Sequence, residues 1–261
     1  MKSKTGTALV TGASSGIGAE ICELLAADGH DLVLVARRRE RLETLASRLM
    51  ADHGIKATVL AKDLAAAGAA REVRDSLDAR DITVDVLVNN AGLGDFADVA
   101  RADQTRLLDM LQVNVVALTE LTRLLLPPMC ERGRGRILNV GSMAGFFPGP
   151  GMAVYYASKA YVNSFTEALA TELAGSGVTA TVLCPGPVAT EFQAEAHLEG
   201  SRFVKMAPMQ TTEMVARAGY SAMKKGRVME IPGIQYKLLP QLTRFSPRAA
   251  VRSVVRFLQT P

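Results

Sequence analysis

Apolar and polar positions along the chain predict strands and helices in alternation. Short runs rich in Val, Ile and Leu indicate buried strands, and longer stretches with helically spaced apolar residues lie between them. We expect strands at residues 7–10, 31–36, 57–61, 84–89, 136–140, 179–184 and 227–231. We expect helices directly after the first strand and at residues 39–53, 65–80, 103–131, 152–174 and 211–224.

The expected strands are apolar on both faces, which is typical of a parallel sheet covered by helices on both sides. We therefore predict an α/β fold with a Rossmann-type doubly wound parallel sheet of about seven strands. The 261 residues can bury a large core, and no linker or repeat interrupts them. We expect a single domain over residues 1–261.

Composition is that of an ordinary globular protein, with 48% hydrophobic and 21% charged residues. The first four residues lead directly into the first strand, so we expect no signal peptide. The most apolar helix, around residues 107–126, is interrupted by Glu120 and Arg123. It is interpreted as a buried core or subunit-interface helix rather than a membrane span.

Cysteines and histidines suggest no metal site. Their spacing matches no metal-ligand pattern, and an odd number of cysteines fits small buried side chains in a reducing cytoplasm. The residues concerned are Cys22, Cys130, Cys184, His30, His53 and His197. We expect a cytoplasmic protein without histidine catalysis.

A glycine-rich turn follows the first strand. Its sequence is Thr11-Gly12-Ala13-Ser14-Ser15-Gly16-Ile17-Gly18. Glycines let backbone N–H groups approach a phosphate, and the N-terminus of the following helix favours negative charge. The turn therefore predicts a nucleotide site, although a tight connection without a ligand would have the same glycines.

The second strand ends where an acidic residue would hold the ribose 2′-hydroxyl of NAD. This chain has Ala36 there, followed by Arg37, Arg38 and Arg39. A guanidinium matches a 2′-phosphate, so the pattern favours NADP with Arg37 as the phosphate contact. Arg38 and Arg39 are interpreted as the solvated start of a helix.

Tyr155 and Lys159 stand one helical turn apart, and Ser142 lies thirteen residues before the tyrosine. A nearby ammonium favours tyrosinate and is expected to lower the tyrosine pKa. A serine hydroxyl near the pair can bind the reacting oxygen. Most Tyr–Lys pairs at this spacing are surface residues. Whether this pair is catalytic therefore depends on the other motifs of the chain.

Together these motifs resemble the short-chain dehydrogenase/reductase family over residues 5 to 232. They keep the family's order and spacing, and they also include Asn89-Asn90-Ala91-Gly92, Asn114 and Pro185-Gly186-Pro187-Val188-Ala189-Thr190. The resemblance implies a nicotinamide cofactor, which the arginines after the second strand predict to be NADP, and hydride transfer between the nicotinamide and a substrate carbon. It implies Tyr155 as acid or base, with Ser142 polarising the oxygen.

The resemblance also assigns roles to other positions. Asn114 would hold a water that links Lys159 to solvent, although it could instead be a buried amide bonded to nearby backbone. Lys159 would bind the nicotinamide ribose. Asp63 and Leu64 would lie at the adenine, although Asp63 could equally cap a helix. Asn90, Ala91 and Gly92 would approach the cofactor, while Asn89 could be structural. Pro185, Gly186, Val188 and Thr190 would cover the nicotinamide.

Residues 191–210 are expected to cover the active site. Their apolar and basic side chains suggest a lipophilic carbonyl or alcohol substrate, which could carry an anionic end. These side chains are Phe192, Phe203, Val204, Met206, Met209, His197, Arg202 and Lys205. The same segment could instead pack as a lid on its own domain. We expect no nucleic-acid partner and a homo-oligomer, either dimer or tetramer. The alternatives are a catalytically idle NADP-binding regulator and a related epimerase or dehydratase.

The tail at residues 233–261 is basic and amphipathic. From residue 231 to the end it carries five basic and no acidic residues, so the remaining residues sum to −1 against a net charge of +4. Arg248, Arg252 and Arg256 share one helix face, and Val251, Val254, Val255 and Leu258 lie largely on another. We favour packing over the substrate entrance or a subunit over membrane attachment, which we expect to be weak.

Overall fold

The computed structural model describes residues 5–196 and 208–259, which form one sheet with helices on both faces. Seven parallel strands follow the order β3-β2-β1-β4-β5-β6-β7. They are β1 (Thr7–Thr11), β2 (Asp31–Ala36), β3 (Ala57–Ala61), β4 (Val84–Asn89), β5 (Gly135–Val140), β6 (Val178–Leu183) and β7 (Met229–Glu230). The predicted Rossmann-type sheet is confirmed.

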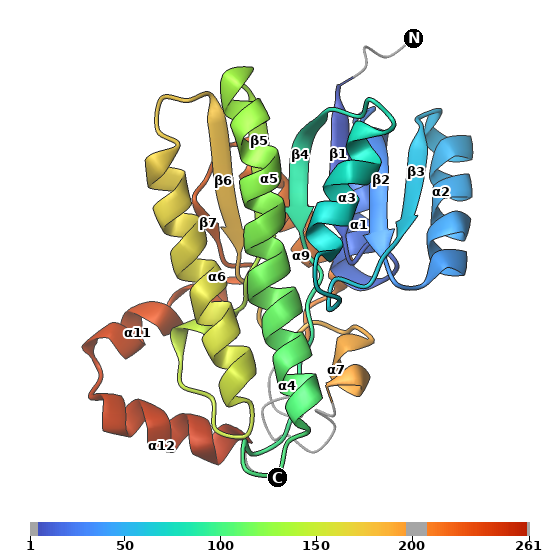
Figure 1. The fold of residues 1–261 in the computed structure, drawn as a ribbon. Coiled ribbons are helices and arrows are strands. Elements are labelled where there is room, and N and C mark those ends of the chain that lie inside the picture. Colours follow the sequence, from blue (N-terminus) through green and yellow to red (C-terminus); the bar gives the residue numbers. More distant parts are fainter. Residues whose placement is uncertain (1–4, 197–207, 260–261) are drawn as a thin grey trace.

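Alternate strand residues enter two separate cores, because successive side chains point to opposite faces of a sheet. In β1, Ala8 and Val10 join one core and Leu9 joins the other. The first core is covered by α1 (Gly16–Ala27), α2 (Arg39–His53) and α9 (Thr212–Lys224). The second is covered by α3 (Ala69–Asp78), α5 (Leu118–Glu131) and α6 (Ala153–Glu172). Figure 1 shows α3, α5 and α6 in front of the sheet and α1 and α9 behind it.

Several predicted boundaries shift by one or two residues, and two predicted elements are much shorter in the structure. The helix expected at 65–80 begins at Ala69, because Gly68 adopts a left-handed φ of 77° directly before it. The last strand was expected at 227–231, but only Met229 and Glu230 pair with β6. Arg227 lies before it and forms an ion pair with Glu230 instead.

The helix expected at 103–131 contains an irregular turn. α4 (Gln104–Leu111) passes into the π-helical η1 (Gln112–Ala117) and then into α5. Among the described residues, 104–131 is the one helix long and apolar enough to cross a membrane by length and composition. Its buried side chains, among them Leu121 and Leu125, pack in the second core, as expected of a core helix of a globular protein.

The C-terminal part forms three helices after β7. These are α10 (Ile234–Lys237), α11 (Leu239–Phe245) and α12 (Arg248–Gln259), which we call the C-terminal arm, residues 234–259. Figure 1 shows α11 and α12 beyond the sheet, with α12 passing below the N-terminal end of α6. The arm therefore lies at the carboxyl ends of the strands, where ligands of such sheets bind.

Candidate active site

A cavity of about 540 Å³ opens at the carboxyl ends of the strands, where the strand order reverses between β1 and β4. Of the predicted cofactor residues, the following line it: Gly12, Ser14, Ser15, Gly16, Ile17, Arg37, Asp63, Leu64, Asn90, Ala91, Gly92, Tyr155, Lys159, Pro185, Gly186, Val188 and Thr190. Gly18 does not line it. A Cβ at Gly18 would overlap the carbonyl oxygen of Gly12, so this glycine allows the turn to close.

Hydrogen bonds from β4 hold the glycine-rich turn. The Asn90 amide donates to the carbonyl oxygens of Thr11 and Gly12, at 3.0 and 3.1 Å. The Thr11 hydroxyl accepts from the backbone N–H groups of Asn90 and Ala91, both at 3.0 Å. Asn90 therefore connects the end of β4 to the glycine-rich turn. Asn89 is buried and donates to Thr122 and Asn139, which is a structural role.

The N-terminus of α1 faces the cavity without a side-chain cap. Ser15 is the N-cap residue but makes no capping hydrogen bond, and the first turn holds no acidic residue. Free N–H groups at a helix start favour an anion. Together with the open glycine turn, this donor set fits the diphosphate of a dinucleotide.

Arg38 extends across this turn. Its guanidinium donates to the Ser14 hydroxyl at 3.1 Å and to the Ser15 hydroxyl at 2.8 Å. The interpretation of Arg38 as part of a solvated helix start is therefore wrong, since the side chain folds back over the phosphate-binding turn. Arg37, the predicted phosphate contact, lines the cavity with an exposed side chain.

Glu191 joins this basic group from the other side of the cavity. Its carboxylate accepts from Arg38 and from Arg41 in the first turn of α2, each at 2.7 Å. Hydrogen bonds from Arg41 and Arg38 lower the pKa of this carboxyl. The ion pairs thus connect the segment after Thr190 with the start of α2. Sequence reasoning missed this contact because the partners are 150 and 153 residues apart.

Asp63 and Leu64 lie at the edge of the cavity near β3. The Asp63 carboxylate accepts from the backbone N–H of Ala65 at 3.0 Å, which stabilises a turn. It does not cap α3, which begins at Ala69. Its predicted position beside an adenine stays a prediction.

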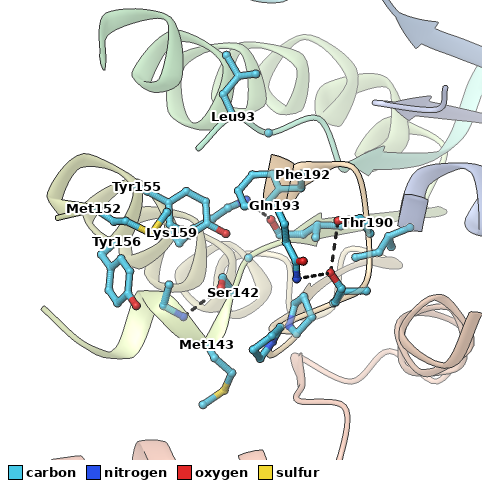
Figure 2. Close-up of a pocket in the computed structure, with 18 of the residues that line it drawn as sticks. Leu93, Ser142, Met143, Met152, Tyr155, Tyr156, Lys159, Thr190, Phe192 and Gln193 are labelled. Atoms are coloured by element: carbon cyan, nitrogen blue, oxygen red, sulfur yellow. Dashed lines mark hydrogen bonds between the residues drawn. The ribbon is translucent and has the colours of Figure 1, made fainter. Parts of the chain in front are cut away.

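Tyr155 and Lys159 lie on the first turns of α6, and Ser142 lies two residues after β5, at the N-cap of a short 3-10 helix. The structure brings all three to the same cavity (Figure 2). The ammonium of Lys159 is buried, donates to the carbonyl oxygen of Val140 at 2.8 Å and lies 5.9 Å from the centre of the Tyr155 ring. The surface-pair alternative is thereby excluded.

The pKa of Tyr155 differs from the prediction. Burial raises the pKa of Tyr155 to about 12, although a hydrogen bond with Ser142 acts to lower it. Burial also lowers the pKa of Lys159 to about 8, because the charged form loses its water. The expectation of a lowered tyrosine pKa is wrong, since desolvation by burial outweighs the hydrogen bond with Ser142 that acts to lower it.

Asn114 lies within the π-helical turn and is buried. Its amide oxygen accepts from the backbone N–H of Leu93 at 2.8 Å, and its amide nitrogen donates to Leu93 and to Ser158. A Cβ at Gly92 would meet both the Asn114 amide oxygen and the Lys159 ammonium, at 3.4 and 3.5 Å. Asn114 and Lys159 therefore flank Gly92, and the water-holding role stays a prediction.

Gln210 holds the loop at residues 185–190 and was missed from the sequence. Its buried side chain accepts from the N–H of Gly186 at 3.2 Å and donates to the carbonyl oxygen of Pro232 at 2.6 Å. Its backbone pairs with Pro187 and Ala189. A lone glutamine in a predicted covering segment carries no sequence signal for this role.

The far end of the cavity is apolar. Phe192, at the start of α7 (Phe192–Glu195), lies beside the Tyr155 ring, with ring centres 5.4 Å apart (Figure 2). Other apolar side chains come from both the sheet domain and the arm: Met143, Phe147, Met152, Val251, Val255 and Leu258. The predicted covering residues 197–207, including His197, Arg202, Phe203, Val204, Lys205 and Met206, lie outside the described residues.

Comparison with known proteins agrees with this geometry. Residues 6–199 match the model of the short chain dehydrogenase family. A solved short-chain dehydrogenase from Sphingobium yanoikuyae in complex with NADPH is 31% identical, with a TM-score of 0.83 over 98% of each chain. The chain belongs to the short-chain dehydrogenase/reductase family. The resemblance inferred from its motifs is confirmed.

Two curated relatives widen the comparison. Ketoacyl reductase HetN of Nostoc sp. is 36% identical over 91% of this chain and 82% of that protein. The very-long-chain 3-oxoacyl-CoA reductase of Anas platyrhynchos is 35% identical over 70% of this chain and 60% of that protein. This chain therefore spans less than two thirds of the latter's length. Members of this family are oxidoreductases that use NAD(P), which agrees with the predicted reaction class.

Proposed function

We propose that this protein is an NADP(H)-dependent oxidoreductase that interconverts a carbonyl and a secondary alcohol on a lipophilic substrate. One observation carries the proposal. A half-buried tyrosine, a serine and a buried lysine share a single cavity with an uncapped helix N-terminus and two arginines. The proton donor and the dinucleotide cradle are thus close enough to serve one reaction.

The preference for NADP follows from the charges at the end of β2. Ala36 offers no carboxylate to a ribose 2′-hydroxyl, and Arg37 and Arg38 both line the cavity there. The Sphingobium relative, which carries NADPH, supports the same choice. When bound, the cofactor would supply or accept the hydride. The glycine turn would hold its diphosphate, and the two arginines its 2′-phosphate.

Tyr155 acts as the acid in reduction and as the base in oxidation. With a pKa of about 12 it stays protonated at neutral pH, which suits proton donation to a carbonyl oxygen. Ser142, hydrogen-bonded to Tyr155, would hold and polarise that oxygen. Lys159 would place a cation behind the tyrosine and stabilise the negative charge that develops on it.

The substrate class follows from the wall opposite the cofactor cradle. Met143, Met152, Phe192 and the inner face of α12 present carbon and sulfur atoms to it. An apolar wall favours an apolar body beside the reacting carbonyl. The oxoacyl and ketoacyl reductase names of two relatives support an acyl-like substrate class.

The test is NADPH oxidation with a panel of ketones and 3-oxoacyl thioesters of increasing chain length. We expect turnover that requires Tyr155 and a KM that falls as the apolar body grows. A water-soluble ketone serves as the reference for the apolar contribution. Failure of every carbonyl to be reduced, with NADPH bound normally, would overturn the proposal in favour of an idle NADP-binding protein.

A further inference from the structure

The outer surface of the C-terminal arm carries apolar side chains that no part of the described chain covers. Ile234, Leu238, Leu242 and Phe245 follow a spacing of four, four and three residues, so they form one stripe along α10 and α11. Ile234 is 82% exposed and Phe245 is 85% exposed. We call this set the apolar stripe. Exposed contiguous apolar side chains mark an interaction site.

The inner side of the same arm belongs to the cavity. Val251, Val255 and Leu258 are half-buried and line it, and Gln259 at the end of α12 donates to the Tyr156 hydroxyl. The predicted packing over the substrate entrance therefore accounts for one face of the arm only. Leu242 and Val254 are exposed and also line the cavity. The cavity mouth is thus continuous with the outer apolar surface.

The positive charge of the C-terminal arm favours one kind of partner for the apolar stripe. The chain from residue 231 onward carries +5, while residues 1–230 sum to −1. Arg248 and Arg252 are exposed on α12. Lys237, a third basic residue of the arm, forms an ion pair with Glu230. An isologous contact with a second copy would bring the exposed Arg248 and Arg252 of two basic arms together, which Coulomb repulsion opposes. An anionic lipid surface instead supplies the missing negative charge.

We propose that the C-terminal arm docks reversibly on an anionic lipid bilayer, with the apolar stripe in the interface and the arginines on the headgroups. Basic amphipathic helices bind membranes in this manner without crossing them. The docked cavity mouth faces the bilayer. A lipophilic substrate can then enter between α11 and α12 without passing through water, a step that rests on the proposed function.

The binding test uses the full-length protein and vesicle sedimentation. Vesicles of phosphatidylcholine with about 30% phosphatidylserine are compared with phosphatidylcholine alone, at about 50 mM and about 150 mM salt. Wild type pellets with anionic vesicles several-fold more than with neutral ones, and less at the higher salt. Arg248→Gln with Arg252→Gln lowers anionic binding by about tenfold or more. Ile234→Gln with Phe245→Gln removes the binding that persists at the higher salt.

Matched control variants distinguish binding by the arm from nonspecific effects of surface charge and surface hydrophobicity. Arg71→Gln with Lys225→Gln removes two exposed charges elsewhere, and Val99→Gln with Leu108→Gln removes two exposed apolar side chains elsewhere. Both controls keep wild-type binding. Equal loss in a control and its arm variant, or no preference of wild type for anionic vesicles, overturns the proposal. A wild-type dimer that Ile234→Gln with Phe245→Gln splits, without vesicle binding, assigns the stripe to a second copy.

Turnover provides an independent readout. The Ile234 and Phe245 variant keeps the wild-type rate on a water-soluble ketone, while its KM rises several-fold for a lipophilic ketone presented in anionic vesicles. Vesicle binding without any carbonyl reduction would refute the proposed function and leave the docking intact. Reduction of soluble and vesicle-borne ketones alike, with no vesicle binding, would refute the docking alone.

Discussion

The two ends of the cavity are held in different ways. At the cofactor end, Asn90 and Thr11 fasten the glycine turn to β4 through four hydrogen bonds of 3.0 to 3.1 Å. At the substrate end, the arm contacts the body through dispersed pairs such as Gln259 with Tyr156 and Tyr236 with Pro208. The first end is therefore built for one ligand geometry, and the second can adapt to a range of apolar shapes.

Tyr155 lies between the cofactor end and the substrate end of the cavity. Removing its hydroxyl should slow the reaction without changing the structure of either end. Tyr155→Phe is expected to lower kcat by about 10²- to 10⁴-fold, because the proton donor is lost. Cofactor affinity, measured by NADPH fluorescence, should stay at the wild-type value. Tyr161→Phe on the same helix is the control, since its hydroxyl bonds to Thr119 at the surface. An equal loss in Tyr161→Phe would point to helix packing rather than proton transfer.

Cofactor selectivity tests the rigid end. Arg38→Ala should reduce the preference for NADPH over NADH by about ten- to a hundredfold, the value of one charge-assisted contact. Arg37→Ala should reduce it less, because that side chain is more exposed. Both dissociation constants are measured for each variant, with Arg39→Ala as control. An unchanged preference in Arg38→Ala, or an equal loss in Arg39→Ala, would show that the phosphate binds elsewhere.

The pH dependence of turnover tests the role of the Lys159 ammonium, which lies between the two ends of the cavity. The pKa of Lys159 is lowered to about 8, so its cation is present below that pH and lost above it. Reduction should therefore slow above pH about 8, approaching tenfold per unit. Tyr155, with a pKa near 12, stays protonated throughout that range. In Lys159→Arg the pH at which the rate falls should be higher, because a guanidinium stays charged. A fall at the same pH as in wild type would show that Lys159 is not the group that titrates.

The smallest effect is expected at the adaptable end. Gln259→Leu removes the hydrogen bond to Tyr156 and should raise KM for a lipophilic substrate about two- to tenfold, with kcat and NADPH affinity unchanged. Tyr156→Phe should act alike, and the double variant should be no worse than either single one. Gln241→Leu, exposed on α11, is the matched control. Additive losses would mean that the two side chains act separately.

Much of the rigid end could be predicted from the sequence, because its signals are local. The glycine turn, the Tyr155–Lys159 spacing and the strand pattern each lie within a few residues. Arg38 was misjudged because its backbone, at φ −82° and ψ 88°, turns the side chain back over Ser14 and Ser15. Gln210 and Glu191 act through partners far along the chain, which periodicity does not reveal.

The substrate end could be predicted only in outline. The sequence indicated an amphipathic tail over the entrance, and the cavity lining of Val251, Val255 and Leu258 agrees with it. It could not show that Leu242 lies both at the surface and in the cavity wall. It also gave the wrong direction for the Tyr155 pKa, since burial depends on what packs around the ring.

Because residues 112–117 form a π-helical turn, we expect turnover to depend on the number of residues in this turn. Such a turn already holds one residue beyond an α-helical repeat. Deleting Val116, whose side chain is 40% exposed, should let the segment return to α-helical geometry with its helicity kept in circular dichroism. The deletion would rotate Asn114 by about 100° relative to α5, away from Leu93. A one-residue indel outside the cavity would thus act as an active-site mutation, and wild-type turnover in the deletion variant would disprove this.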